Sequence, residues 1–373
     1  MHRRVLFAME LGANFGHLSR CLALARRCRD EGLQVLLASP DLGGVAKVVA
    51  GEGVRLLQAP LLPFAAQGPR PINYAGLLLR RGFSDVEGLK AAVAGWLGLF
   101  DLVSPEAIIC DHAPTALLAL KISKLHGIVT GSAIEIPAAG ASLPSFLPLD
   151  VPAPALDEGL ADFLIGNINS ILSGYGADNF TRIDDLFADI PKFIFGFPAL
   201  DPSGYRADVR YLGALREFPV MPKGHWRGGG RPKVLVYLRR ETPEMDDVVG
   251  HLARIGADVL LVGTDKDQRP ICLSEIVPAA DLVITHGSDL VIRALSEGVP
   301  SLVVPRTVEQ FYCGLGIEKI RCGATLKEEG VANQIDLLLA DREVRGRANA
   351  FSIENKEKFY EHRAEHQWSA LMS

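Results

Sequence analysis

The first half of the chain alternates short apolar runs with segments in which apolar residues recur every three or four positions. The short runs suit buried strands, and the longer segments suit helices with one apolar face. The expected strands cover residues 5–9, 34–38, 54–59, 107–110 and 128–131, and the expected helices cover 18–31, 43–51 and 114–125. This order predicts a parallel sheet with helices on both faces, which is a doubly wound α/β fold.

A stretch rich in glycine and proline, with consecutive glycines at 228–230, separates this half from a second α/β segment. The second segment has expected strands at 233–238, 257–263, 281–285 and 301–304, and expected helices at 242–255, 288–298 and 309–320. We therefore expect an N-terminal domain over 1–218, a linker over 219–232 and a second domain over 233–345. A charged helical tail over 346–373 follows, and it could pack back on the N-terminal domain.

Composition and charge exclude several classes of protein. The chain of 373 residues is 48% hydrophobic and 22% charged with a net charge of −5, which is typical of a globular protein and does not favour nucleic acid as a partner. The six cysteines form no C-x-x-C pair, so buried reduced thiols are expected rather than disulfides or a zinc site.

The N-terminus and the apolar runs bear on localisation. Glu10 interrupts the first apolar run too early for a signal peptide, and no run reaches the roughly 18–20 residues of a membrane span. A cytoplasmic protein is therefore expected. Residues 77–81 (Leu-Leu-Leu-Arg-Arg) could contact a membrane surface peripherally, or they could form a buried helix face with a solvated end.

The loop after the first expected strand carries a candidate catalytic histidine. Gly12 and Gly16 allow the backbone to approach a ligand closely, and His17 stands where the loop becomes a helix. Open α/β sheets bind their ligands at this carboxyl edge, and a histidine can accept a proton at neutral pH. The alternative is that His17 caps the helix or packs in the core.

Asp111 follows the expected strand 107–110 and is therefore expected at the same edge of the sheet. A carboxylate in this place can orient an imidazole and stabilise its protonated form. Its alternative role is to cap the helix that begins near Pro114. The adjacent His112 is expected to be secondary.

The second α/β segment contains candidate anion-binding groups. The turn at 286–288 (His-Gly-Ser) leads into a helix N-terminus, which favours a phosphate. Arg239 ends an expected strand and suits bidentate phosphate contact, although a solvated charge is the alternative. Glu309 and Gln310 begin the next expected helix and could accept hydrogen bonds from the hydroxyls of a sugar.

Taken in order, these segments resemble the GT-B glycosyltransferases, close to the family-1 enzymes that use nucleoside-diphosphate sugars. They are also similar to the N-acetylglucosaminyltransferase that forms lipid II. The resemblance covers nearly the whole chain. It is carried by residues 12–17, 22–27, 105–111, 211–213 and 281–305, and the last of these segments is the most specific.

The resemblance implies two Rossmann-like domains that face each other across a cleft, the first binding the acceptor and the second the nucleotide-sugar. It implies an inverting transfer without metal or cofactor, in which His17 is the base and Asp111 its partner. The implied donor is a UDP- or dTDP-sugar, and the implied acceptor is a small molecule, a lipid or a glycan. The residues that the resemblance places at the donor are Gly16, Arg239, Cys272, Leu273, His286, Gly287, Ser288, Asp289, Glu309 and Gln310.

The donor loop departs from the family pattern. Many family-1 members carry His-Gly-Gly-x-Gly-Thr where this chain has His-Gly-Ser-Asp-Leu-Val at 286–291. Asp289 places a negative charge beside the expected diphosphate, and Val291 removes a hydroxyl. A catalytically silent binding or scaffold protein of the same fold is therefore an alternative function, and a nucleotide-sugar 2-epimerase is another. The loops at 60–82 and 131–154 are expected to shape the acceptor site.

Overall fold

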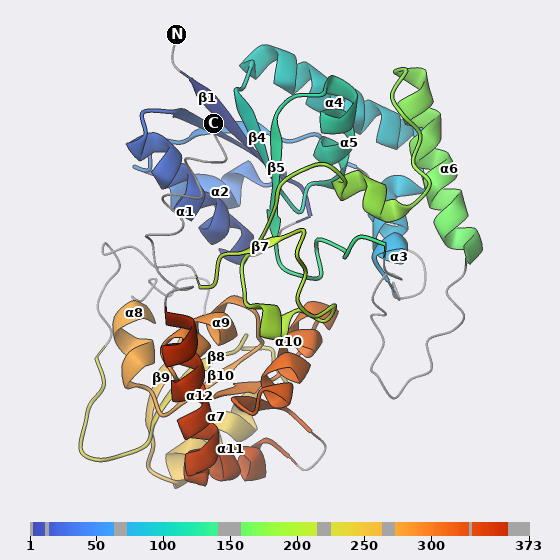
Figure 1. Cartoon of the computed structure of the whole chain (residues 1–373). Coiled ribbons are helices and arrows are strands. Elements are labelled where there is room, and N and C mark those ends of the chain that lie inside the picture. The colour runs from blue at the N-terminus through green and yellow to red at the C-terminus, as the bar shows by residue number, and fades with distance from the viewer. Residues whose placement is uncertain are drawn as a thin grey trace. The chain divides into compact units, whose positions relative to one another are not determined.

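The computed structural model of the chain describes residues 3–11, 15–62, 73–140, 158–214, 225–262, 273–327 and 330–356 (Figure 1). The chain divides into two compact units. The first unit holds the described residues up to Ile194 together with Arg206–Arg210. The second unit holds Phe195–Tyr205 and the described residues from Tyr211 onward.

The first unit is built on a seven-stranded sheet with the order β3-β2-β1-β4-β5-β6-β7. Strands β1 to β6 pair in parallel with their neighbours. The strands are β1 (Arg4–Met9), β2 (Gln34–Ser39), β3 (Arg55–Gln58), β4 (Ala107–Asp111), β5 (Gly127–Gly131), β6 (Lys192–Ile194) and β7 (Arg210–Tyr211). The helical segments are α1 (Phe15–Asp30), α2 (Leu42–Val49), α3 (Tyr74–Leu78), η1 (Leu79–Phe83), α4 (Val86–Val103), α5 (Pro114–Ser123), α6 (Glu158–Gly174) and η2 (Ile183–Phe187).

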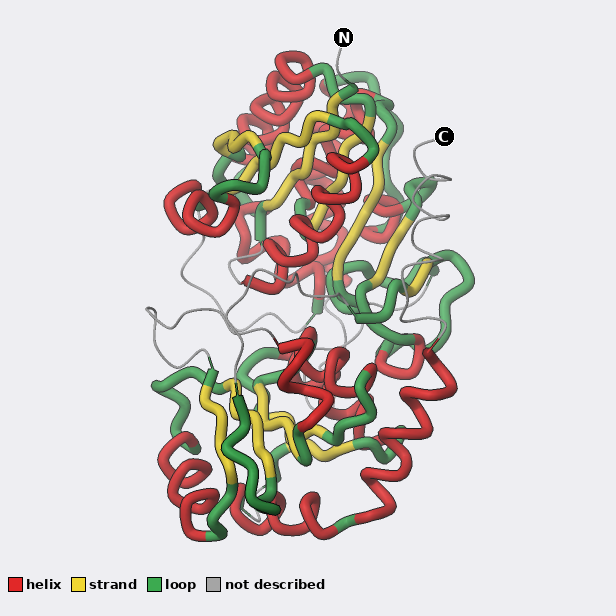
Figure 2. The backbone as a smooth tube through the Cα atoms, turned by 90° about the vertical axis from the view of Figure 1, so that its left-hand side faces the viewer, coloured by secondary structure: helices red, strands yellow, loops and turns green. Residues whose placement is uncertain are grey.

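The second unit is built on a five-stranded parallel sheet with the order β12-β11-β10-β8-β9. The strands are β8 (Lys233–Tyr237), β9 (Asp258–Leu261), β10 (Leu282–Thr285), β11 (Ser301–Val303) and β12 (Gly323–Thr325). The helical segments are η3 (Pro198–Leu200), α7 (Met245–Arg254), α8 (Leu273–Ile276), η4 (Val277–Ala279), α9 (Asp289–Ser296), α10 (Val308–Lys319), α11 (Val331–Ala340) and α12 (Arg342–Asn355). Helices flank the strands of each sheet (Figure 2).

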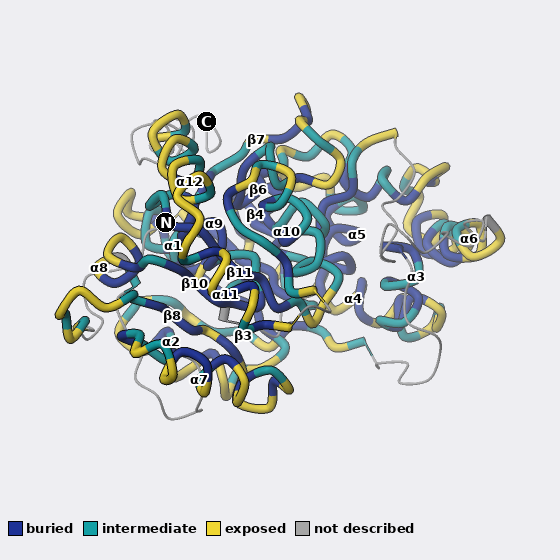
Figure 3. Tube along the Cα trace, turned by 90° about the horizontal axis from the view of Figure 1, so that it is seen from below, coloured by how far each residue is buried: buried dark blue, intermediate teal, exposed yellow. Residues whose placement is uncertain are grey.

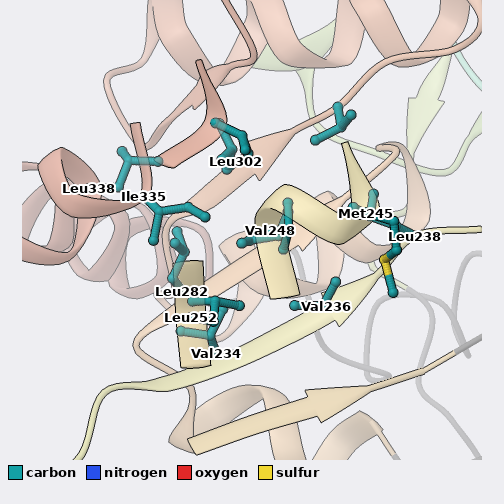
Figure 4. Packing of buried hydrophobic residues seen from close by; sticks show 13 residues of the cluster. Val234, Val236, Leu238, Met245, Val248, Leu252, Leu282, Leu302, Ile335 and Leu338 are labelled. Atoms are coloured by element: carbon teal, nitrogen blue, oxygen red, sulfur yellow. The ribbon is translucent and has the colours of Figure 1, made fainter. Parts of the chain in front are cut away.

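The central strands are buried along their whole length, as expected of a parallel sheet that helices cover on both faces. Every residue of β4 and of β10 is buried, and dark blue marks the buried segments of the chain in Figure 3. In the second unit, apolar side chains of the sheet pack against α7 and α11 (Figure 4). This cluster includes Val236, Val248, Leu282, Leu302 and Ile335. The prediction of two doubly wound parallel sheets is confirmed.

Residues 195–205 and 211–214 pack with the second unit, although the sequence analysis assigned them to the first domain. Phe197 is buried in an apolar cluster with Val303 and Ile317, and Leu200 packs against the same cluster. The predicted boundary between the two domains lies at the glycine-rich stretch, because glycine and proline indicate a linker. The burial of apolar side chains upstream of that stretch determines which unit the segment joins.

The described part of the expected tail packs on the second unit. It lies in α12, which runs beside α9. Ala348 is fully buried there, and the Phe351 ring meets the Phe197 ring edge-on with the centroids 5.3 Å apart. Residues 357–373 of the expected tail and 219–224 of the expected linker lie outside the described residues.

The described cysteines are buried free thiols, as the sequence predicted. They are Cys21, Cys28, Cys110, Cys313 and Cys322. Burial raises the pKa of the Cys28 thiol to about 12, which keeps it protonated at neutral pH.

Two further observations bear on membrane contact. Among the described helices, none is both long and apolar enough to cross a membrane. Leu78 and Leu79 are buried, which agrees with the alternative that residues 77–81 form a buried helix face. The loop expected at 60–82 contains α3 and most of η1, whereas residues 63–72 lie outside the described part of the chain.

Gly323 is expected to be intolerant of any side chain. It pairs with Ser301 across β11 and β12, and a Cβ atom at this position would lie 2.2 Å from the Ser301 carbonyl oxygen and 2.8 Å from the Ile317 Cδ1 atom. We expect Gly323→Ala to lower the free energy of unfolding by about 1–3 kcal/mol, because the strand must move to relieve the overlap. Denaturant titration measures this change.

The matched control is Gly346→Ala in α12, where an added Cβ meets nothing within 4 Å. It should raise the free energy of unfolding by about 0.5–1 kcal/mol, because alanine is the better helix former. Equal stability of the two variants would contradict the steric account of Gly323.

Candidate functional site

His17 and Asp111 meet at the carboxyl edge of the first sheet. His17 lies in the first turn of α1, directly after β1, and Asp111 is the last residue of β4, which pairs with β1. The His17 Nδ1 atom lies 2.6 Å from the Asp111 Oδ1 atom, and Asp111 is fully buried. The sheet topology thus brings together two side chains that are far apart in the sequence. The preceding residues 12–14 lie outside the described part of the chain, and Gly16 is half-buried in the first turn of α1.

Two neighbours fix the Asp111 carboxylate. The Arg20 Nε–H donates to Asp111 Oδ2 at 3.2 Å, and the Thr130 hydroxyl donates to the same oxygen at 3.1 Å. The alternative that Asp111 caps α5 is wrong, because Ala113 holds the N-cap position without a side-chain hydrogen bond. Glu10 accepts from the Thr115 and Ala116 backbone N–H groups instead.

Glu135 is a site residue that the sequence analysis missed. Its Oε1 atom lies 3.3 Å from the His17 Nε2 atom, and its Oε2 atom accepts from the Ser132 N–H at 2.7 Å and from Arg20 Nη2 at 3.1 Å. Glu135 follows β5, the strand beside β4, so the rule that selected Asp111 also selects this position. It lies in the loop 131–154, which was expected to shape the acceptor site, but no individual polar residue of this loop was predicted as a site residue.

The buried charges favour a proton on His17. Burial lowers the pKa of His17, but the charge of Glu135 and the hydrogen bond to Asp111 raise it, and the balance is a pKa of about 9. Burial alone would raise the pKa of Glu135, but the charges of Arg20 and His17 hold it well below its usual range. Protonated His17 therefore lies between two carboxylates in the resting protein.

His112 lies beside this pair in an unusual backbone conformation, with a φ of 45°. Its ring lies nearly parallel to the His17 ring, with an angle of 20° between the ring planes and the centroids 5.9 Å apart. Burial lowers the pKa of His112 to about 4, so the imidazole is neutral at physiological pH. Its Nε2 atom is buried and has no hydrogen-bond partner among the described residues. His17, His112 and Glu135 each offer a possible metal-ligand atom, and the three atoms lie within 4.8 Å of one another.

In the second unit, the His286 imidazole ties two strand ends together. Its Nδ1–H donates to the Val304 carbonyl oxygen at 2.8 Å, and its Nε2 accepts from the Arg239 backbone N–H at 3.1 Å. Burial lowers the pKa of His286, which agrees with a neutral ring in this tautomer. Both ring nitrogens are therefore hydrogen-bonded within the second unit, so the imidazole has a structural role here. The Arg239 side chain is exposed.

The turn after β10 places Ser288 and Asp289 at the start of α9, where Glu309 of α10 also reaches. Gly287 has a φ of 129°, and a Cβ there would lie 3.3 Å from the Gln310 Cα atom, so the turn requires glycine. The Ser288 hydroxyl donates to Glu309 Oε1 at 2.9 Å, and Asp289 is the first residue of α9. Two carboxyl-bearing residues thus stand at a helix end that otherwise favours anions.

Gln310 has a structural role in the helix that it begins. Its side-chain oxygen accepts from the Arg306 N–H at 2.7 Å and from the Thr307 N–H at 3.1 Å, and it forms a capping box with Thr307 at the start of α10. Leu273 begins α8 and packs on an apolar cluster of the second unit. Cys272 lies outside the described residues.

No protein-family model and no curated protein matches this sequence. Solved structures are similar over nearly the whole chain. The calicheamicin glycosyltransferase CalG4 has a TM-score of 0.72 at 18% identity, over 100% of this chain and 98% of that one. The glycosyltransferase SnogD from Streptomyces nogalater has a TM-score of 0.65 at 18% identity, over all of both chains.

The glycosyltransferase SsfS6 from Streptomyces sp. SF2575, complexed with thymidine diphosphate, has a TM-score of 0.64 at 18% identity and matches over 95% of this chain and 96% of its own. The chain therefore has the GT-B fold that these enzymes share, with one parallel α/β sheet in each unit.

Proposed function

We propose that the protein is an inverting glycosyltransferase that moves a sugar from a nucleoside diphosphate to an acceptor hydroxyl without a metal. The observation that carries this proposal is the His17–Asp111 pair, with Nδ1 and Oδ1 2.6 Å apart at the carboxyl edge of the first sheet. The GT-B fold supports the same class of reaction, because solved glycosyltransferases share it. Fold alone does not define a function, so the site carries the argument.

In the proposed mechanism, Asp111 accepts the His17 Nδ1–H and so leaves a lone pair on Nε2. The acceptor hydroxyl transfers its proton to Nε2 while its oxygen attacks C1 of the donor sugar from the face opposite the leaving group. The bond from C1 to the diphosphate oxygen breaks with its electron pair, so the nucleoside diphosphate leaves and the anomeric centre inverts. Asp111 then stabilises the imidazolium.

We place donor binding in the second unit, at the N-terminus of α9. Backbone N–H groups at a helix start can hold a diphosphate and stabilise the charge that develops on it. Because solved structures of this fold hold thymidine diphosphate, a dTDP-sugar is the first donor to test, and a UDP-sugar is the second. The acceptor is proposed to be a small molecule, with a lipid or a glycan as the wider class.

Calorimetric titration with dTDP, UDP and GDP, in metal-free buffer, tests the donor site. We expect one of these nucleotides to bind, and we expect Arg239→Ala to weaken its binding about tenfold or more, because a charge-assisted hydrogen bond to phosphate is lost. Arg240→Ala is the matched control, and it should retain the wild-type Kd. Equal Kd values for wild type and Arg239→Ala would remove Arg239 from the donor site.

The second candidate function is a catalytically silent binding protein of the same fold. The observation that favours it is the Asp289 position at the start of α9 together with the Ser288–Glu309 hydrogen bond, because both place carboxyl groups where a diphosphate would lie. If no nucleotide binds to the wild type, the same titration with Asp289→Asn is decisive. Restored binding would identify Asp289 as the residue that silences the site, and continued absence of binding would contradict the transferase proposal.

A further inference from the structure

The spacing of three side chains beside Asp111 matches the ligand spacing of a tetrahedral metal site. The Glu135 Oε1 atom lies 3.3 Å from His17 Nε2 and 3.6 Å from His112 Nδ1. Ligand atoms about 2.0–2.1 Å from a tetrahedral zinc ion are separated from one another by about 3.3 Å. Two of the three separations are therefore close to the values that such an ion requires, and all three lie within 4.8 Å.

Hydrogen bonds behind the three ligands already orient two of them. Asp111 binds the Nδ1 side of His17, which turns Nε2 toward Glu135. The Ser132 N–H and Arg20 hold Glu135 Oε2, which leaves Oε1 on the side of the two imidazoles. A carboxylate behind a ligating histidine, and donors behind a ligating carboxylate, are the usual supports of metal ligands.

His112 supplies an independent observation. Its imidazole is largely buried, and its Nε2 atom has no hydrogen-bond partner among the described residues. Burying a polar ring without partners is costly, so the side chain needs an explanation that the proposed transfer reaction does not provide. The left-handed backbone of His112 adds to this cost, because few residues with a side chain adopt it. The proposed ligand atom is Nδ1, on the side of Glu135, so a ligand role accounts for the burial of this ring beside a carboxylate and for its held backbone, but not for the unpartnered Nε2 atom.

We propose that His17, His112 and Glu135 bind a divalent transition-metal ion of the zinc type, with a fourth coordination position open. In the resting protein, Arg20 and protonated His17 balance the charges of Asp111 and Glu135, so the ion must displace the proton from His17 Nε2. Once that proton has left, the charges of Asp111, Glu135 and Arg20 sum to −1, which favours a cation. Arg20 contacts the Oε2 oxygen of Glu135, and the proposed ligand is Oε1. Two imidazole ligands and one carboxylate ligand, with a fourth position open, are typical of zinc sites.

One consequence rests on the proposed function. The ion and the acceptor proton would use the same lone pair on His17 Nε2, so a bound ion would block the base. The ion is therefore an inhibitor of a metal-independent transfer rather than a cofactor. Metal binding itself does not depend on the transferase proposal, because it is measured without donor or acceptor.

The test is a competition for Zn²⁺ between the metal-free full-length protein and a chromophoric chelator. We expect one equivalent of Zn²⁺ to bind to the wild type, and we expect His112→Ala and Glu135→Gln each to weaken this binding at least about tenfold. His126→Ala replaces an exposed histidine of the same unit and should keep the wild-type affinity. Circular dichroism confirms that each variant is folded.

A second measurement on the wild type does not depend on the folding of any variant. Co²⁺ bound in a tetrahedral site of nitrogen and oxygen ligands gives intense visible absorption, which Zn²⁺ should abolish by displacement. The proposal is overturned if the wild type takes no Zn²⁺ from the chelator, or if folded His112→Ala and Glu135→Gln bind it as tightly as the wild type. If the ion binds but does not inhibit transfer, the site stands and the role of His17 as the base is contradicted.

Discussion

Replacing His17 by alanine is expected to lower the rate of sugar transfer by about 10²–10⁴-fold, the usual contribution of a general base. The variant lacks the imidazole that Asp111 orients, so the proton of the acceptor hydroxyl loses Nε2, its proposed acceptor. Nucleotide binding is proposed to lie in the second unit, so the Kd for the nucleoside diphosphate should not change. Turnover with a radiolabelled donor sugar and calorimetry on the same preparation measure the two effects.

His126→Ala is the matched control, because it removes an exposed imidazole from the same unit. It should transfer sugar at the wild-type rate. A His17→Ala protein that retains most of the wild-type turnover would remove His17 from the role of base. Loss of both turnover and nucleotide binding would instead indicate a folding defect, which circular dichroism detects.

The second prediction concerns the dependence of transfer on pH. His17 must be neutral to accept a proton, and its pKa in the free protein is about 9. We therefore expect kcat/KM to rise about tenfold per pH unit below the pKa and to become constant above about pH 9, because the base form increases with pH. The measurement is a profile of kcat/KM in buffers treated with a chelator, so that no metal competes with the proton.

Glu135→Gln is expected to shift this profile to lower pH. Burial lowers the pKa of His17, and the charge of Glu135 is the largest of the effects that raise it. Without that charge the neutral imidazole becomes more abundant at pH 7, so transfer at neutral pH should increase. Glu31→Gln, an exposed position after α1, should leave the profile unchanged. An unshifted profile for Glu135→Gln would show that Glu135 does not control the proton on His17.

The fold was largely predictable from the sequence, because the strands of a parallel sheet are nearly continuous apolar runs. Residues 107–110 and 281–285 gave clear signals, and β4 and β10 lie there. The helix α4 was not predicted, since its apolar positions follow a segment rich in proline, glycine and arginine. Phe197 gave no local signal for the unit that it joins, because its partners, such as Ile317, are distant in sequence.

The candidate site was predictable where strand order alone fixes a position. The adjacency of β1 and β4 puts His17 beside Asp111, and the resemblance to known enzymes had implied this pair. Glu135 gives no signal of periodicity, because it lies beyond the end of β5 in an irregular segment; only the rule that ligands bind at the carboxyl ends of parallel strands points to its position. The structural hydrogen bonds of His286 could not be predicted either, since their partners at Val304 and Arg239 are distant in sequence. The bonds of Gln310 are local, and the spacing of Thr307 and Gln310 is that of a capping box, which is a signal the sequence does contain.

The way in which the chain passes between the two units limits how the protein can be divided or recombined. It leaves the first unit after Ile194, returns to it for Arg206–Arg210, and leaves it again at Tyr211. A chimera joined at the glycine-rich residues 228–230 would exchange the second unit without Phe197 and its apolar neighbours. The transplanted half would then lack part of its own core, so grafting a foreign second unit requires residues 195–205 of that unit to be carried along with it.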